Sequence, residues 1–196
     1  MKIGIVSDIH GNIDALDQAI ARMGTVDEIW CAGDAFNQYR FSNEVIGRLR
    51  ELGARYVLGN HEEILLGPHG ERARAGERVD RDLLAWCAER PHWIKQSIDG
   101  ARVLMFHSTP WEPYGEYLYP HHARLAEFAG IEADFVIYGH THTQMARRVG
   151  EVMVINPGSA GLGVDPANGR RLSYAVLDTA SGRVDFDDFD DPTLLR

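Results

Sequence analysis

Short apolar runs recur along the first half of the chain, and stretches with helical periodicity separate them. This alternation predicts strands near residues 2–7, 27–32 and 54–58, with helices near 12–23 and 42–52. Ser42 is a suitable N-cap for the second of these helices. Strands that alternate with helices indicate a parallel sheet with helical crossovers.

The second half of the chain is richer in strands and in turn residues. Asp99-Gly100 lies between two alternating runs and is a strong signal for a two-residue hairpin turn. The predicted strands are 93–98, 101–107, 134–138, 144–149, 151–156, 171–178 and 183–188, and the predicted helices are 80–90 and 121–129. Residues 67–80 lack periodicity, and we expect a mobile loop there; 108–120 form a second loop. The order predicts a mixed α/β (α+β) fold of two mixed β-sheets packed face to face, with helices outside each.

Composition narrows the class of protein. The chain has 196 residues and no internal repeat or low-complexity tract, so we expect a single domain over 1–196. The formal charge of −9 argues against a polymeric nucleic-acid partner, which favours a basic surface. No signal peptide or membrane-spanning run is apparent in the sequence, and Cys31 and Cys87 read as free thiols, so we expect a cytoplasmic location.

Five polar segments each follow a predicted strand. They are Asp8-Ile9-His10, Gly33-Asp34, Gly59-Asn60-His61-Glu62, Phe106-His107 and Gly139-His140-Thr141-His142. Neighbouring strands of one sheet can deliver such side chains to one spot. The mixture of imidazole, carboxylate and amide suits divalent zinc, manganese, iron or cobalt. Two ions a few ångströms apart could clamp the attacking and leaving oxygens of a displacement at phosphorus.

In this order the five segments resemble those of the calcineurin-like metallophosphoesterases, in particular the small bacterial phosphodiesterase-like members. The resemblance extends to Asn156-Pro157-Gly158-Ser159. It implies a four-layer αββα sandwich and two divalent metal ions (Mn, Fe, Zn, Co or Ni, with Mn favoured in vitro). One ion would take Asp8, His10 and His142, the second would take Asn60, His107 and His140, and Asp34 would bridge them.

The same resemblance implies how catalysis would proceed. A hydroxide bridging the metals would attack the phosphorus of a small phosphorylated substrate. His61 would stay off the metals and would steady a phosphoryl oxygen or protonate the leaving alkoxide, with Glu62 as its orienting partner. A phosphodiester is the preferred substrate, and a phosphomonoester remains an alternative. A non-catalytic scaffold on the same fold is a further alternative, which the retention of His61 disfavours.

Substrate contacts are less defined. Residues 35–42 depart from the Gly-Tyr-Gly-Pro run expected in small bacterial members, so substrate preference cannot be carried over. Arg40 in this segment, and Asn12 after the first polar segment, are candidate substrate-binding residues. The arginines Arg72, Arg74 and Arg78 belong either to a solvated loop or to a phosphate-recognising lid.

Aromatic residues crowd the loop after His107. They are Trp111, Tyr114, Tyr117 and Tyr119. Packing of the loop, or a contact between copies of the chain in a homo-oligomer, is favoured over a stacking wall for a base or an aromatic leaving group. His69, His92, His121 and His122 lie outside the five segments and are expected to be surface, packing or capping residues.

Overall fold

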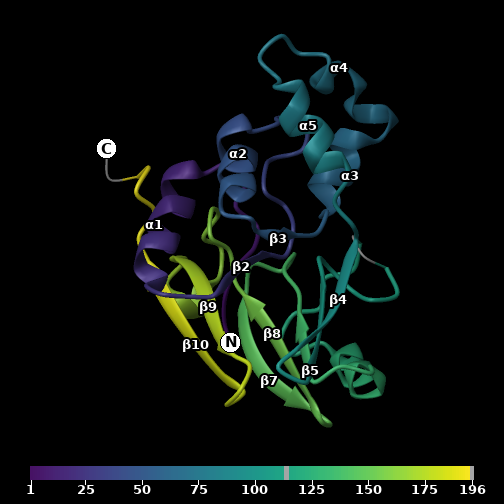
Figure 1. The fold of residues 1–196 in the computed structure, drawn as a ribbon, viewed down its shortest axis with the longest axis vertical. Helices are drawn as coiled ribbons and strands as arrows, with labels where there is room; N and C mark the ends of the chain where they lie inside the picture. The colour runs from purple at the N-terminus through teal and green to yellow at the C-terminus, as the bar shows by residue number, and fades with distance from the viewer. Residues whose placement is uncertain (113–114, 195–196) are drawn as a thin grey trace.

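The computed structural model describes residues 1–112 and 115–194 and contains two five-stranded sheets that face each other (Figure 1). The first sheet has the order β10-β9-β1-β2-β3, and the second has the order β4-β5-β6-β8-β7. The strands of the first sheet are β1 (Lys2–Val6), β2 (Glu28–Cys31), β3 (Arg55–Tyr56), β9 (Leu172–Asp178) and β10 (Arg183–Phe189). Those of the second are β4 (Trp93–Ile98), β5 (Ala101–Phe106), β6 (Phe135–Ile137), β7 (Gln144–Val149) and β8 (Val152–Pro157).

Both sheets combine parallel and antiparallel pairing. In the first sheet β1, β2 and β3 are parallel, and β9 and β10 extend one side of it through antiparallel pairing. In the second sheet β5, β6 and β8 are parallel, and β4 and β7 are antiparallel. The predicted two mixed sheets are therefore confirmed, and the parallel strands point their carboxyl ends toward one end of the molecule.

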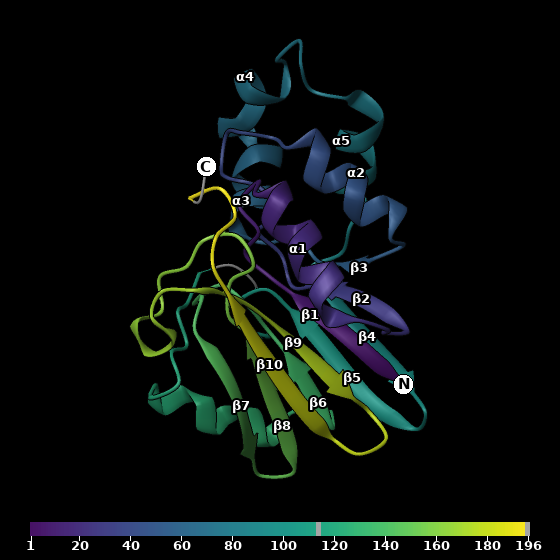
Figure 2. The same cartoon turned by 90° about the vertical axis from the view of Figure 1, so that its left-hand side faces the viewer.

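Helices flank the sheets, as Figure 2 shows from the side. They are α1 (Ile13–Met23), α2 (Asn43–Glu51), α3 (Asn60–Leu66), α4 (Glu71–Arg74) and α5 (Arg81–Ala88), with the 3-10 helices η1 (Pro68–Gly70), η2 (Ala123–Gly130) and η3 (Pro166–Asn168). The side chains of Asn12, Ser42 and Asp80 cap α1, α2 and α5 by accepting hydrogen bonds from the first turn. Among residues 1–112 and 115–194, no helix is both long enough and apolar enough to cross a membrane.

Three hydrophobic clusters separate the four layers. The middle one joins the facing sheets and includes Ile3, Trp30 and Ile155, which have no solvent exposure. A second cluster packs α1 and α2 against the outer face of the first sheet, through residues such as Leu16 and Ile46. The third packs η2 against the second sheet. This layering matches the αββα sandwich.

Several local predictions need correction. Residues 67–80 are not one irregular loop, because η1 and α4 lie within them. The guanidinium of Arg74 donates hydrogen bonds to the carbonyls of Leu65 and Gly67, and an added Cβ at Gly70 would clash with the Leu65 carbonyl. These turns depend on backbone capping and close approach rather than on an apolar stripe, so periodicity did not detect them.

Two further elements differ from the prediction. The segment 121–129 forms a 3-10 helix, with i to i+3 hydrogen bonds such as Leu125 N to His122 O (3.1 Å). The strand near 54–58 shortens to β3, because α3 begins directly at Asn60. The Asp99-Gly100 hairpin is confirmed, and both residues have the positive φ angles (52° and 84°) of a tight primed turn.

We predict that Ile155→Ala lowers the free energy of unfolding by about 2–5 kcal/mol, because it opens a cavity between the sheets. Ile94→Ala removes the same atoms from a partly exposed side chain that packs on the same cluster, and serves as the matched control. Urea denaturation of both variants measures the difference. Equal losses at the two positions would contradict the placement of the central core.

Candidate metal centre

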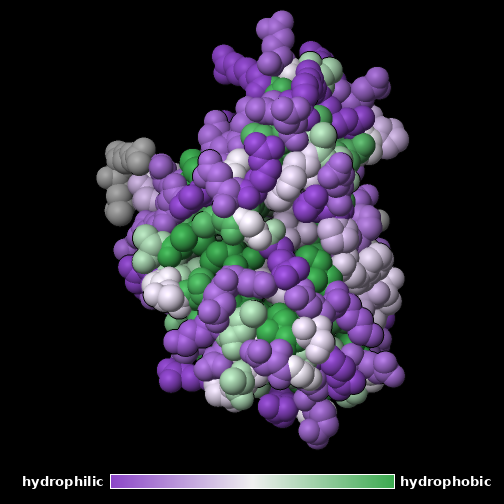
Figure 3. All heavy atoms as spheres, in the orientation of Figure 1, coloured by the Kyte–Doolittle hydropathy of each residue, from purple (hydrophilic) through white to green (hydrophobic). Residues whose placement is uncertain are grey.

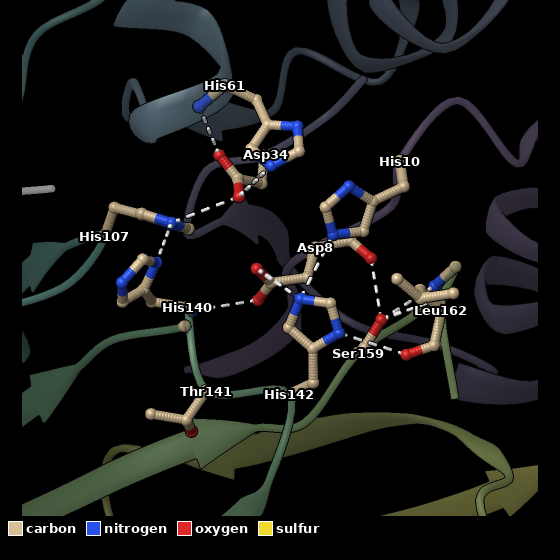
Figure 4. Close-up of polar contacts among 12 residues, drawn as sticks. Asp8, His10, Asp34, His61, His107, His140, Thr141, His142, Ser159 and Leu162 are labelled. Atoms are coloured by element: carbon tan, nitrogen blue, oxygen red, sulfur yellow. Dashed lines mark hydrogen bonds and ion pairs between the residues drawn. The ribbon is translucent and has the colours of Figure 1, made fainter. Parts of the chain in front are cut away.

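The five polar segments lie at the carboxyl ends of β1, β2, β3, β5 and β6 and meet where the two sheets face each other. Figure 4 shows their rings and carboxylates turned toward a common centre. Five of these residues have left-handed backbone, with φ between 51° and 66°: Asp8, His10, Asp34, His140 and His142. Such angles are uncommon outside glycine and concentrate at functional sites. The backbone is therefore turned to aim the side chains.

Asp8, His10 and His142 form the first group of candidate ligands. The Nε2 atoms of His10 and His142 lie 3.1 Å apart, and Nε2 of His142 is 3.3 Å from Oδ1 of Asp8. Nδ1 of His142 lies 3.1 Å from the Leu162 carbonyl, to which it can donate a hydrogen bond. That bond holds Nε2 toward the centre, as metal-binding histidines require.

Asp34, His107 and His140 form a second group, and Asn60 joins it. Nε2 of His107 lies 3.0 Å from Oδ1 of Asn60, 3.1 Å from Nδ1 of His140 and 3.4 Å from Oδ2 of Asp34. Nδ1 of His107 is 2.7 Å from the Ala32 carbonyl and can donate to it, which turns Nε2 inward. All seven predicted ligands are thus brought together, and their binding of metal stays a prediction.

The donor atoms fit divalent cations. Oδ1 of Asp8 is buried and accepts no hydrogen bond from residues 1–112 or 115–194, although polar atoms in a protein interior are nearly always satisfied. Two pairs of imidazole nitrogens lie 3.1 Å apart, so that one proton, or in its place one cation, can join the two rings of each pair. Carboxylate oxygen, amide oxygen and imidazole nitrogen together suit borderline metals such as zinc, iron or manganese.

His61 points at the same centre from the start of α3. Its Nδ1 accepts a hydrogen bond from the Gln38 backbone N–H at 2.8 Å, and its Nε2 lies 3.7 Å from Oδ2 of Asp34. His61 also forms a third cluster of possible ligand atoms with His10 and Asp34. Its position suits contact with a substrate phosphoryl group, and its expected exclusion from the metals stays a prediction.

The role expected for Glu62 needs correction. Its carboxylate is fully buried and does not orient the His61 ring, which the Gln38 N–H holds instead. Four donors reach the carboxylate at 2.7–3.0 Å: the backbone N–H groups of Asp34, Ala35 and Gly59, and the Tyr56 hydroxyl. Burial, and after it the nearby Asp34 carboxylate, raises the pKa of Glu62 to about 7. Glu62 therefore ties together the loops that follow β2 and β3, and no pattern in the sequence indicated the part that Tyr56 plays.

A second layer of hydrogen bonds holds the loop after β6. The amide of Asn156 donates to the Gly139 carbonyl (2.7 Å) and to Oγ1 of Thr141 (3.1 Å). The Ser159 hydroxyl donates to the Asp8 carbonyl at 2.7 Å. A Cβ at Gly139 would clash with the Ser7 hydroxyl, so glycine is required where the two sheets approach.

Protonation in the centre follows from burial and pairing. Burial alone would raise the pKa of Asp34, but His107 lowers it well below its usual range. Burial alone would lower the pKa of His107, but Asp34 raises it to about 10. Burial lowers the pKa values of His10 and His140 to about 4, so both rings are neutral at pH 7. Without metal, the centre is therefore held by a histidinium–carboxylate pair next to neutral imidazoles.

The aromatic residues after His107 divide into two sets. Tyr117 stacks on the His140 ring with ring centroids 3.9 Å apart. The ring of Tyr119 is nearly parallel to that of Tyr117, with centroids 6.1 Å apart. Both tyrosines line a cavity of about 210 Å³ with Asp34, Asn60, His61, His140 and His142. Trp111 instead packs on Phe128 and under the Arg124 guanidinium. Tyr114 lies outside the described residues.

The two candidate substrate residues border a larger groove of about 770 Å³ that begins at His10. Arg40 lines it and is exposed. The amide of Asn12 is engaged by the protein: Oδ1 caps α1, and Nδ2 donates to Oδ1 of Asp191 (3.1 Å). The structure thus gives Asn12 a capping role, and its expected substrate contact stays a prediction.

The family model described as the calcineurin-like phosphoesterase superfamily domain matches residues 1–182. The chain belongs to this superfamily. It is 26% identical to phosphodiesterase YfcE of Escherichia coli K12, over 91% of this chain and 88% of that protein. It is 28% identical to phosphodiesterase MJ0936 of Methanocaldococcus jannaschii, over 81% and 83%.

The chain also shares its fold with a solved structure. A metallophosphoesterase from Sphaerobacter thermophilus is 27% identical and superposes with a TM-score of 0.80, covering 99% of this chain and 90% of that one. Phosphodiesterase relatives within a phosphoesterase superfamily indicate that the chain is a hydrolase. The family depends on metal, and the clustered histidines and aspartates are the candidate ligands.

We predict that metal binds to this phosphoesterase with the release of a proton. His107 is protonated in the metal-free protein below its pKa of about 10 and must lose that proton to become a ligand. The apparent association constant should therefore rise with pH, about ten-fold per unit for one released proton. Calorimetric titration with Mn²⁺ at pH 6.5 and 8, in two buffers of different ionisation enthalpy, measures this release. Equal affinities at both pH values would contradict it.

Proposed function

We propose that this chain is a phosphodiesterase that hydrolyses a small phosphorylated substrate at a centre of two divalent metal ions, most simply Mn²⁺. The observation that carries the proposal is the pair of facing ligand groups, with Asp34 positioned beside both. Asp8, His10 and His142 would hold one ion; Asn60, His107 and His140 would hold the other; Asp34 would bridge them. Phosphodiesterase YfcE and phosphodiesterase MJ0936, as relatives of the chain, support the reaction class.

Divalent ions held by these residues would neutralise the charge of the phosphate ester and make a water molecule acidic enough to act as nucleophile. His10 and His140 are neutral at physiological pH because burial lowers their pKa values to about 4, so each offers a lone pair. Glu62 holds the two loops that carry Asp34 and Asn60 in register. The Gln38 N–H orients the His61 ring so that Nε2 can hydrogen-bond a phosphoryl oxygen or protonate the leaving alkoxide.

Two alternatives remain on the same fold. A phosphomonoesterase would use the same centre as a phosphodiesterase, and the ester that is hydrolysed distinguishes the two. A non-catalytic scaffold has no need of a histidine such as His61. Among the residues that the structure describes, Nε2 of His61 has no polar partner but the Asp34 carboxylate, at 3.7 Å. That placement favours an enzyme.

We predict that the Mn²⁺-loaded protein hydrolyses bis-p-nitrophenyl phosphate faster than p-nitrophenyl phosphate. Asp34→Asn should lose metal and at least about a hundred-fold in turnover, because the bridging charge is removed. Asp185→Asn on exposed β10 is the matched control and should retain both. Absence of turnover on both esters and on cyclic nucleotides would refute the proposed function, and a preference for the monoester would favour a phosphatase.

We predict that His61→Ala keeps its metal and loses about 10²–10⁴-fold in kcat, the usual contribution of a positioned acid. Elemental analysis after gel filtration measures the metal, and initial rates measure kcat. His69→Ala removes an exposed histidine of η1 and controls for the substitution itself. If His61→Ala lost metal in proportion to activity, the ring would be a ligand.

A further inference from the structure

The 770 Å³ groove continues from the candidate centre past Asn37, Tyr39 and Arg40 to the segment that joins α4 and α5. Its volume falls in the range of pockets that enclose small organic ligands. One end is His10, a candidate metal ligand, so a substrate with its phosphorus at the centre would extend an ester arm into this groove. The groove is therefore the space that lies open to the part of the substrate that does not react.

Two tight tethers fix the wall nearest the centre. The Asn37 side chain donates to the His10 carbonyl at 2.9 Å, and the Arg40 N–H returns to the Asn37 carbonyl at 2.9 Å. Between them, the Gln38 N–H bonds the His61 ring, and Tyr39 adopts a positive φ of 63°. Arg40 is thus carried on a turn that is bonded to two residues of the centre, through the Asn37 side chain and the Gln38 backbone.

Another wall comes from the connection between α4 and α5. The Asn43 amide at the start of α2 donates to the Arg78 carbonyl (2.7 Å) and accepts from the Asp80 N–H (2.9 Å). This clamp places Arg78 along the same groove as Arg40. Figure 3 shows that the helical region above the sheets carries mostly hydrophilic side chains on the face in view, as a solvated wall requires.

The charges that line the groove differ in how they are satisfied. The guanidinium groups of Arg40 and Arg78 have no hydrogen bond or ion pair with any residue in 1–112 or 115–194, unlike Arg22, which pairs with Asp187 at 2.7 Å. The acidic residues along the groove are engaged. They are Asp14, which has a partner of its own, Glu44, bonded by Ser42, and Asp191, bonded by Asn12 and Thr193. Within the described residues the groove therefore contains two unpaired guanidinium groups, while Glu44 and Asp191 keep their negative charge because Ser42, Asn12 and Thr193 are neutral donors.

We propose that this groove binds a second phosphate group of the substrate, held by Arg40 and Arg78. The guanidinium fork matches the oxygens of an anionic group in a bidentate arrangement, and a phosphate has enough oxygens and charge to engage two guanidinium groups at once. The proposal rests on the proposed function and narrows its substrate class to phosphodiesters in which one ester arm carries a further phosphate. Arg40 and Arg78 are then specificity residues, apart from the reacting atoms.

Two chromogenic diesters with one scissile bond test the proposal. The first is the p-nitrophenyl ester of thymidine 5′-phosphate, and the second carries an added 3′-phosphate. The kcat/KM of the Mn²⁺-loaded wild type should be about ten-fold higher for the second, as expected for charge-assisted hydrogen bonds to an anion. In Arg40→Gln and in Arg78→Gln the ratio of the two kcat/KM values should fall to about one, and Arg40→Lys should restore part of it.

Arg72→Gln is the matched control, because Arg72 lies on α4, is exposed and does not line the groove. It should keep the wild-type ratio. A wild-type ratio of one or below, or an unchanged ratio in the Arg40 and Arg78 variants, overturns the proposal. The proposal is also overturned if the wild-type kcat/KM is higher for p-nitrophenyl phosphorylcholine, whose distal group is a cation, than for the diester with the added 3′-phosphate.

A binding measurement separates this inference from the proposed function. If the wild type hydrolysed neither diester, the proposed function would fail. The groove would still be expected to bind thymidine 3′,5′-bisphosphate about ten-fold more tightly than thymidine 5′-phosphate by calorimetry, and to lose this difference in Arg40→Gln. Equal affinity of the wild type for the two nucleotides would refute the groove assignment whatever the activity.

Discussion

The candidate centre depends on two buried carboxylates that each use their two oxygens for different tasks. Oδ2 of Asp8 accepts the backbone N–H of His140 at 3.0 Å and so links the first sheet to the second, while Oδ1 is left for the centre. Oδ1 of Asp34 accepts the N–H of His61 at 3.0 Å, while Oδ2 faces the histidines. Each carboxylate thereby fixes the loop that carries its neighbouring ligand, and the left-handed backbone of these loops is held by the same bonds.

This arrangement places several negative charges in the protein interior, where the loss of solvation disfavours ionised groups. Asp8 and Asp34 are almost fully buried beside the fully buried Glu62, and uncompensated carboxylates in such a place would be strongly destabilising. In the metal-free protein, ionised His107 offsets part of that charge, and four donors satisfy Glu62. Divalent cations would replace the histidine protons as the compensating charge. The residues that bind the ions are thus also those whose repulsion the ions relieve, which couples metal affinity to the stability of the loops.

The sequence predicted the parts of the site that are encoded locally. Each ligand segment directly follows its own strand, so the pattern of apolar runs with Asp8, Asp34 and His107 at their ends was sufficient to place them. The pattern could not show that Glu62 bonds to Tyr56 and to the turn after β2, because the first contact is made by a side-chain hydroxyl and the second by backbone N–H groups 27 and 28 residues away. It also missed η1 and α4, whose turns depend on capping by Arg74 rather than on an apolar face.

The cavities around the centre bear on the choice between diester and monoester. The groove of about 770 Å³ begins at His10, and the cavity of about 210 Å³ is bounded by His61, His142 and Tyr117; the rings of His10 and His61 are in contact, with centroids 4.8 Å apart. Phosphorus held beside these rings would have space on two sides. A monoester has one organic arm and would leave one of these spaces to water, whereas a diester has two arms to fill them. Two cavities that border one set of ligands therefore favour a diester, with the smaller arm against the tyrosines and the larger arm toward Arg40.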